Sequence, residues 1–172
     1  MLVVFSGLPG VGKTTIAREL ARATGAVHVR IDSIEQALRA AGWDVHGEGY
    51  SAAQAVAEDN LRLDRIVVAD CVNPWPLTRQ AWRSVAERVG VRAVDVEIVC
   101  SDLDEHRRRV ESRAADRPGH PLPTWPEVIA RDYRAWDSER LVIDTAQLDV
   151  EQSVRMILSG VGATEAKRDT RP

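Results

Sequence analysis

The stretch from Gly7 to Thr14 reads Gly-Leu-Pro-Gly-Val-Gly-Lys-Thr, and it constrains the fold of this chain more than any other feature. It follows the apolar run Leu2–Phe5 and precedes a helical pattern, so a strand, a glycine-rich turn and a helix are expected in that order. Glycines let successive backbone N–H groups surround phosphate oxygens, and the following helix points the positive end of its dipole at the same anion. The alternative is a glycine-rich turn without a ligand. The spacing favours a loop that binds the phosphates of a nucleoside triphosphate.

Apolar runs alternate with helical patterns along the rest of the chain, which is typical of a parallel sheet wrapped by helices. Strands are expected at about 2–6, 27–31, 65–70, 93–99 and 141–143. Helices are expected at about 13–24, 33–41, 51–64, 77–89, 102–113 and 150–158, with a further helix start at 124–127. The pattern predicts an α/β fold with three layers, helices on both faces of a five-stranded parallel sheet.

Helix-capping signatures set the expected starts of two of these helices. Asp32 or Ser33 is expected to cap one helix, with Glu35 or Gln36 completing a capping box. Ser51 followed by Gln54 repeats the signature, so the next helix is expected to begin at Ser51.

Length and composition limit the classes of function. At 172 residues the chain is expected to form one domain over 1–160, followed by a disordered tail over 161–172. The net charge of -3 argues against a broad electrostatic grip on nucleic acid. Cys71 and Cys100 each follow an apolar run without C-x-x-C spacing, as buried thiols of a reducing compartment do. No apolar stretch approaches the ~20 residues of a bilayer span, so a cytoplasmic protein without membrane contact is expected.

Asp70 ends the apolar run Ile-Val-Val-Ala-Asp, where a carboxylate can hold Mg²⁺ directly or through its water shell. We predict that Thr14 and Asp70 form the metal site; the alternative for Asp70 is a turn-forming role. Many ATP-hydrolysing motors place a glutamate at the next position to orient water, but this chain has Cys71. Transfer to a bound hydroxyl is therefore favoured over hydrolysis.

Asp32 closes the second expected strand, beside the phosphate-binding loop. A carboxylate there can accept the proton of an attacking hydroxyl group, so Asp32 is the candidate general base. An ordinary N-cap role is the alternative, and the two roles are compatible.

Arginines supply positive charge for the transferred phosphoryl group. Arg109 and Arg113 lie one helical turn apart on a shared face, whereas Arg107 lies on a different side; Arg117 follows. We predict that Lys13, Arg109 and Arg113 act in catalysis, and that a lid at about 107–124 closes over the nucleotide. A solvated, ion-paired helix face is the alternative.

This combination of motifs resembles the P-loop small-molecule kinases of the nucleoside-monophosphate-kinase-like superfamily, which includes chloramphenicol phosphotransferase, gluconate kinase, adenylylsulfate kinase and AAA-type ATP-binding kinases. The resemblance covers residues 1 to about 160 and implies a strand order of 2-3-1-4-5 with ATP under the lid. Family members often use the carboxylate after the second strand as general base, which supports Asp32. The nucleotide-binding residues implied are Gly7, Leu8, Pro9, Gly10, Val11, Gly12, Lys13, Thr14, Thr15 and Arg109.

The expected function is transfer of the γ-phosphoryl group of ATP, with Mg²⁺, to a hydroxyl group of a small molecule. No acceptor-binding signature occurs between Gly42 and Ser51 or from Asn73 to Thr78, so the sequence does not identify the acceptor. Two alternatives stay open: a nucleotide-dependent regulatory ATPase, and a polynucleotide 5′-hydroxyl kinase, which the low net charge disfavours.

Overall fold

The computed structural model describes residues 1–113 and 122–166, with residues 163–166 described by their backbone alone. Its centre is a five-stranded sheet with the order β2-β3-β1-β4-β5. The strands are β1 (Leu2–Ser6), β2 (Val27–Arg30), β3 (Val67–Asp70), β4 (Ala93–Val99) and β5 (Leu141–Asp144). All of the pairings are parallel, which confirms the predicted fold class and strand order.

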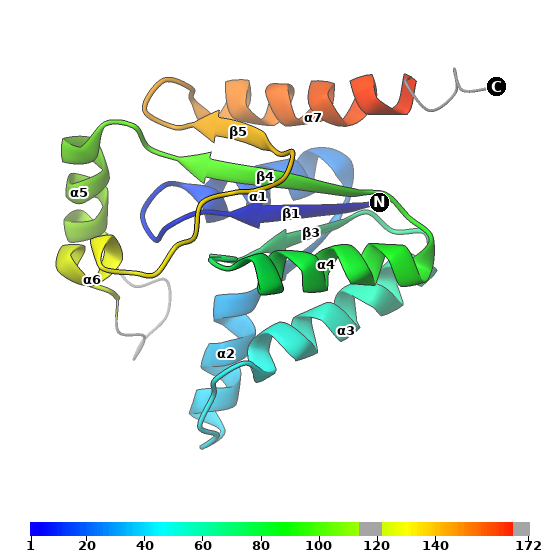
Figure 1. Ribbon diagram of the computed structural model, residues 1–172, viewed down its shortest axis with the longest axis horizontal. Helices are drawn as coiled ribbons and strands as arrows, with labels where there is room; N and C mark the ends of the chain where they lie inside the picture. The colour runs from blue at the N-terminus through cyan, green and yellow to red at the C-terminus, as the bar shows by residue number, and fades with distance from the viewer. Residues whose placement is uncertain (114–121, 167–172) are drawn as a thin grey trace.

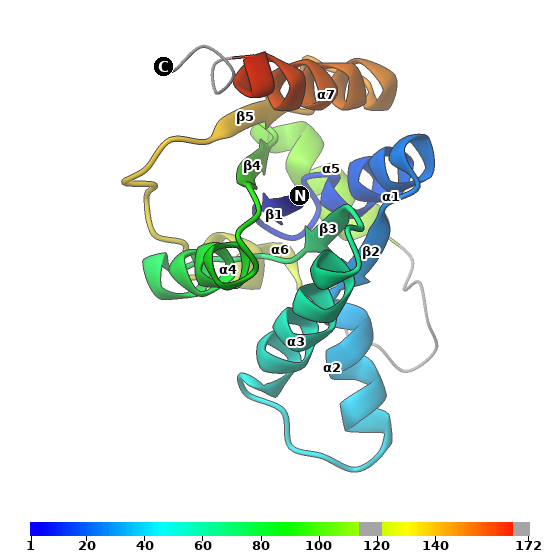
Figure 2. The same cartoon turned by 90° about the vertical axis from the view of Figure 1, so that its right-hand side faces the viewer.

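Helices cover both faces of this sheet (Figures 1 and 2). One face carries α1 (Lys13–Thr24) and α7 (Val150–Ala166), and the other carries α3 (Glu48–Arg62) and α4 (Pro76–Val89). The helix α2 (Ile31–Ala40) packs against α3, while α5 (Leu103–Ser112) and α6 (Trp125–Ile129) lie beyond the carboxyl ends of the strands (Figure 1).

Alternation along β1 explains the two-sided core. Val3 and Phe5 pack with residues of α1 and α7, whereas Leu2 and Val4 pack with residues of α3 and α4. Because successive side chains of a strand point to opposite faces, both sets are buried, and the strand reads as one continuous apolar run. The register places Asp70 opposite both Phe5 and Arg30, so β1, β2 and β3 end close together.

Several predicted boundaries were wrong. The strand β2 ends at Arg30 and Ile31 already belongs to α2, so Asp32 lies in the first turn and is not the cap. The helix α3 begins at Glu48 after Gly47, and Ser51 lies inside it with its hydroxyl donating to the Gly47 carbonyl. A serine within a helix can bond back to a carbonyl one turn earlier, so its capping signature was misleading.

The helices after β4 agree only in part with the sequence-based prediction. The predicted helix start at Thr124 is confirmed, with a capping box between Thr124 and Glu127. The last helix continues to Ala166, beyond the expected end near residue 158. The middle of the expected lid, including Arg117, falls in residues 114–121, and the end of the tail falls in 167–172; both ranges lie outside the described residues. In the part of the chain that is described, no helix combines the length and apolar character of a bilayer span.

Candidate active site

The loop between β1 and α1 owes its shape to three glycines. Gly7, Gly10 and Gly12 have φ angles of 138°, 86° and 97°, in a region that side chains rarely adopt. A Cβ atom on Gly7 would lie 2.2 Å from the Ile98 carbonyl oxygen. Gly12 precedes Lys13, the first residue of α1, and no side chain caps that helix. Its N-terminal N–H groups are therefore available to an anion held in the loop.

Two residues that the sequence did not single out hold this loop from outside. His106, on α5, donates from Nε2 to the Pro9 carbonyl oxygen at 2.8 Å. Thr145, just after β5, donates from Oγ1 to the Val11 carbonyl oxygen at 2.9 Å. Both contacts join positions more than 90 residues apart in the sequence, so no local pattern announces them.

Lys13 is buried at the start of α1, and its Nζ donates to the Leu8 carbonyl oxygen at 2.8 Å. Burial lowers the pKa of Lys13 to about 8, although the negative charges of Asp70 and Asp32 oppose this shift. The ammonium group therefore lies inside the loop and interacts with both carboxylates. When a nucleotide binds, a phosphate oxygen would replace the Leu8 carbonyl oxygen as the acceptor of its hydrogen bond.

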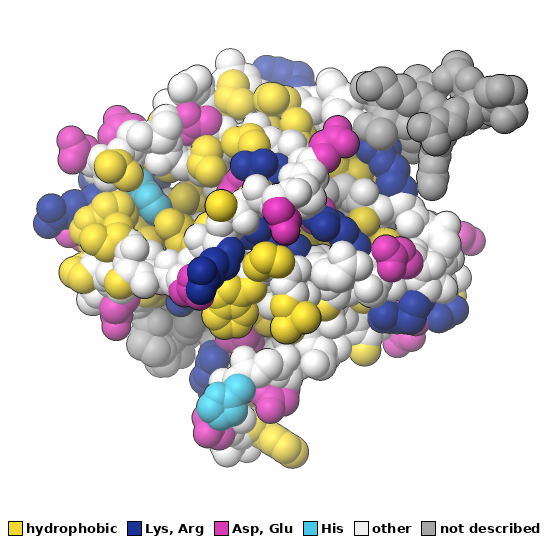
Figure 3. All heavy atoms as spheres, viewed as in Figure 1, with side chains coloured by type: hydrophobic (Ala, Val, Ile, Leu, Met, Phe, Trp, Pro, Cys, Tyr) yellow, Lys and Arg dark blue, Asp and Glu magenta, His cyan; other side chains and the backbone are white. Residues whose placement is uncertain are grey.

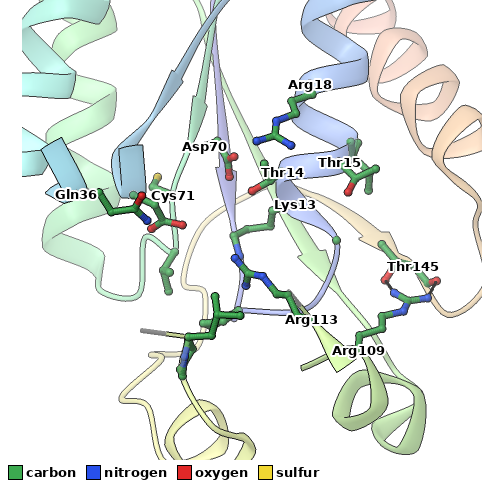
Figure 4. Close-up of a pocket in the computed structure, with 18 of the residues that line it drawn as sticks. Lys13, Thr14, Thr15, Arg18, Gln36, Asp70, Cys71, Arg109, Arg113 and Thr145 are labelled. Atoms are coloured by element: carbon green, nitrogen blue, oxygen red, sulfur yellow. Dashed lines mark hydrogen bonds between the residues drawn. The ribbon is translucent and has the colours of Figure 1, made fainter. Parts of the chain in front are cut away.

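Asp70 is 3% exposed at the end of β3 and faces Thr14 (Figure 4). Burial disfavours its charge, but hydrogen bonds from His28 and Thr14 and the charge of Lys13 outweigh burial and hold the pKa of Asp70 below its usual value. His28 Nε2 lies 3.3 Å from Asp70 Oδ2. The hydrogen bond from His28 fixes one oxygen of an ionised carboxylate, a contribution that the sequence analysis did not assign to this histidine.

The Thr14 hydroxyl and the Asp70 carboxylate fit a magnesium ion by their chemistry. Mg²⁺ prefers hard oxygen ligands, keeps several waters, and needs only one or two carboxylates when phosphates supply other ligands. Among the residues that the structure describes, no group of three or more His, Cys, Asp or Glu side chains could hold a metal ion. Any magnesium ion at Thr14 and Asp70 would accordingly depend on nucleotide phosphates for its remaining ligands.

These residues line a cleft of about 1410 Å³ at the carboxyl ends of the strands. Lys13, Thr14, Thr15 and Asp70 lie on one side of the cleft, and Gln36 and Cys71 lie across from them (Figure 4). Asp32 lines the same cleft. Asp32 is 42% exposed, and Arg30 donates from Nη2 to its Oδ2 at 3.3 Å. The structure therefore brings Asp32, Asp70 and the loop together around one cleft.

Both predicted arginines line this cleft, but they are held differently. Arg109 donates to Glu105 Oε1 at 2.7 Å and to Thr145 Oγ1 at 2.8 Å, so its guanidinium is fixed beside the loop. Arg113 projects toward Lys13 (Figure 4), and its charge is one of the smaller causes that lower the pKa of Lys13, after burial. Arg107 pairs with Glu111 on the exposed side of α5, as expected for a residue on a different helix face.

Cys71 and Asn73 follow Asp70 and are both buried, but only Cys71 lines the cleft. The Cys71 thiol is buried, donates to the Phe5 carbonyl oxygen at 3.2 Å, and has a pKa raised by that burial. Asn73 is 0% exposed and donates from Nδ2 to Ser6 Oγ at 3.0 Å, with a φ of 51°. The Asn73 amide therefore supports β1 and does not line the cleft.

Comparison with known proteins places this geometry in a family. A family model described as an AAA domain matches residues 2–131, which include the loop, Asp32, Asp70 and both arginines. The chain belongs to this family. No curated protein sequence matches the chain. The predicted resemblance to P-loop kinases is confirmed by the AAA domain and by its structural neighbours.

Solved structures, two of them of kinases, share the fold over nearly their whole length. A gluconokinase from Sinorhizobium meliloti superposes with a TM-score of 0.66 at 17% identity, covering 98% of this chain and 97% of that one. The APS kinase of Mycobacterium tuberculosis, solved with AMPPNP and APS, gives 0.69 at 17% identity, covering 94% and 96%. A tunicamycin resistance protein from Deinococcus radiodurans gives 0.63 at 19% identity, covering 94% and 95%. At these identities the similarity shows that the chain shares a fold with its neighbours, and it does not identify a substrate.

Proposed function

We propose that this chain is an ATP-dependent phosphotransferase that moves the γ-phosphoryl group of ATP, with Mg²⁺, to a hydroxyl group of a small molecule. The observation that carries the proposal is the cleft itself. Lys13, Thr14 and Asp70 lie together in it (Figure 4), and Asp32, on α2, lines the same cleft. The AAA-domain family and the kinase fold support the same conclusion.

The loop residues Gly7 to Thr15 would bind the phosphates through backbone N–H groups and the Lys13 ammonium. Thr14 and Asp70 would hold Mg²⁺, which supplies positive charge to the phosphate oxygens when bound. Arg109 and Arg113, which line the same cleft, would add positive charge near the transferred group. Fixed donors of this kind stabilise the transition state more than the ground state.

Asp32 would act on the acceptor. The acceptor oxygen attacks the γ-phosphorus, the bond from that phosphorus to the bridging oxygen of ADP breaks, and the hydroxyl proton passes to the Asp32 carboxylate and then to water. Arg30 donates to the carboxylate from the side of β2 at 3.3 Å, which restricts its orientation. Balanced over the cycle, one alcohol and one ATP give one phosphate monoester, one ADP and one proton.

Hydrolysis and polynucleotide phosphorylation fit the site less well. The residue after Asp70 is Cys71, whose thiol bonds to the Phe5 carbonyl and so offers no carboxylate to orient a water molecule. Basic and acidic side chains are interspersed over the face seen in Figure 3, with no extended basic area to follow a nucleic-acid backbone there. A small-molecule acceptor is therefore the better proposal.

Substitution of Asp32 by asparagine tests the base assignment. The amide keeps the shape of the side chain but cannot take a proton, so acceptor-dependent ADP release should fall about a hundredfold or more. ATP affinity should stay within several-fold of wild type because the phosphate-binding residues are unchanged. The acceptor for this assay comes from a screen of sugars, nucleosides, amino alcohols and antibiotics for acceptor-dependent ADP release.

Asp44→Asn is the matched control, because the Asp44 side chain is 90% exposed and does not line the cleft. It should leave turnover unchanged. An Asp32→Asn enzyme with wild-type turnover would reject Asp32 as the base.

A further inference from the structure

A second cavity of about 400 Å³ adjoins the nucleotide cleft, between the start of α2, the start of α3 and the connection from β3 to α4. Asp32, Glu35 and Arg131 line both cavities. A molecule in the second cavity would therefore reach the same carboxylate that faces the nucleotide. The volume lies in the range of ordinary small-molecule sites, about 300 to 1,000 Å³.

Apolar and aromatic side chains form much of the wall of this second cavity. They come from α3 and from the segment that ends β3 and begins α4, and they are Tyr50, Val72, Pro74, Trp75 and Leu77. Leu77 is 79% exposed and Trp75 is 47% exposed. Hydrophobic side chains gather over the start of α4 in Figure 3, in keeping with these two exposures. The Trp75 indole is held in place because its Nε1 donates to Asp132 Oδ2 at 3.0 Å.

Tyr50 contributes a ring to this wall without contributing a charge. Its hydroxyl accepts the backbone N–H of Asn73 at 3.0 Å, and burial raises the pKa of the phenol. The phenol therefore stays neutral under ordinary conditions and presents an aromatic surface to whatever occupies the cavity.

The charged groups of the wall are mainly acidic. Asp32 and Glu35 supply two carboxylates, and Arg131 is the sole arginine or lysine among the described residues that line the cavity. Glu35 also receives a hydrogen bond from Arg39 at 3.1 Å, and Arg39 lines the nucleotide cleft but not the second cavity. Arg30, which donates to Asp32, lines neither cavity, so the wall itself presents two carboxylates against one arginine, and this disfavours an anionic acceptor.

We propose that the second cavity binds the phosphoryl acceptor and selects an alcohol with an apolar, ring-containing body and no anionic group. This inference rests on the proposed function and names its substrate class. The hydroxyl group lies toward Asp32 and attacks the γ-phosphorus of ATP, releasing ADP and a proton. The ring lies against Tyr50 and Trp75, and Leu77 covers it from the rim. A neutral or singly cationic alcohol fits this wall, whereas a carboxylate or phosphate ester does not.

Three probes that share the unit PhCH2–CH(OH) and a three-carbon chain separate charge from shape: 1-phenylpropan-2-ol is neutral, 1-amino-3-phenylpropan-2-ol is cationic and 3-phenyllactate is anionic. The full chain is given each probe with Mg·ATP while ADP release is measured. Binding to the protein with Mg·AMPPNP is measured separately by saturation-transfer NMR. We expect the neutral and cationic alcohols to bind, and to be phosphorylated with a kcat/KM at least about tenfold above that of 3-phenyllactate.

Leu77→Ala tests the location of the site, with Leu103→Ala as the matched control. Both leucines are exposed at helix starts, but Leu103 is on α5 and lines neither cavity. Loss of the Leu77 side chain should raise the KM for the preferred alcohol about three- to tenfold while leaving the KM for ATP unchanged. The Leu103 variant should match wild type in both constants.

The outcomes separate this inference from the proposed function. Two outcomes would overturn the substrate class alone. One is a preference for 3-phenyllactate. The other is a protein that still binds Mg·ATP but binds neither the neutral nor the cationic alcohol. A Leu77→Ala enzyme identical to Leu103→Ala would overturn the location. Failure to bind Mg·ATP would instead overturn the phosphotransferase proposal itself.

Discussion

Lys13 combines a buried amine with a proposed role that needs its charge. Burial lowers its pKa to about 8, against the opposing effect of Asp70 and Asp32. Triphosphate binding favours the protonated amine, so above pH 8 the protein must take up a proton to bind. The affinity for Mg·ATP should therefore be constant below about pH 8 and fall about tenfold for each further pH unit.

Anisotropy of a fluorescent ATP analogue, measured from pH 7 to pH 9.5, follows this dependence. Lys13→Arg is the control because a guanidinium keeps its charge over the whole range, so its affinity should vary much less with pH. A wild-type affinity that does not change up to pH 9.5 would contradict the lowered pKa.

Single residues also mark what the sequence could and could not predict. Lys13, Thr14 and Asp70 belong to local patterns, and those patterns predicted that they lie in one cleft. His28, His106 and Thr145 act through partners distant in the sequence, so no spacing rule finds them. A histidine that donates to the Pro9 carbonyl has the same local sequence signature as any helix-face histidine.

Among the helices, α4 carries an unusual buried side chain. Arg79 is 1% exposed, and its guanidinium donates to Asn73 O at 3.2 Å and to Arg134 O at 2.6 Å. It also lies 4.1 Å above the centre of the Trp136 ring. It thereby ties the turn after β3 to the segment before β5, and both segments contribute to the wall of the second cavity.

Arg79→Met should lower the free energy of unfolding by about 3 kcal/mol, because buried carbonyl groups lose charged donors. Urea unfolding measures the change. Arg88→Met on the same helix is the control: Arg88 is 53% exposed and pairs with Glu58, so its loss should cost less than about 1 kcal/mol. Equal effects of the two substitutions would contradict the structural role of Arg79.

Element types were easier to predict than element boundaries. The apolar pattern of Val27–Ile31 continues through a β-branched isoleucine, yet Ile31 is buried in the first turn of α2. Propensity favoured a strand there, but packing against the core beside α3 decided the outcome. Similarly, α3 begins at Glu48, before the serine whose capping signature was stronger.

At the scale of the whole molecule, the parallel sheet explains why the site exists. The strands β1, β2 and β3 end together, so the loop, Asp32 and Asp70 meet without adjacent positions in the sequence. The parallel sheet wrapped by helices was predictable from one motif and a repeated alternation, whereas the strand order was implied by the family resemblance. The wall of the second cavity was not predictable, because its side chains come from α2, α3, the start of α4 and Arg131. Only the folded chain places them around one cavity.

Titration calorimetry of Mg·ATP against the full chain at pH 7.5 tests the central claim most directly, namely that the loop from Gly7 to Thr14 grips a nucleoside triphosphate. We predict a saturable heat of binding with one site per chain, and a loss of affinity of at least about a hundredfold in Lys13→Ala, which removes the buried ammonium. Absence of heat with both Mg·ATP and Mg·GTP, in protein that melts cooperatively, would contradict the account.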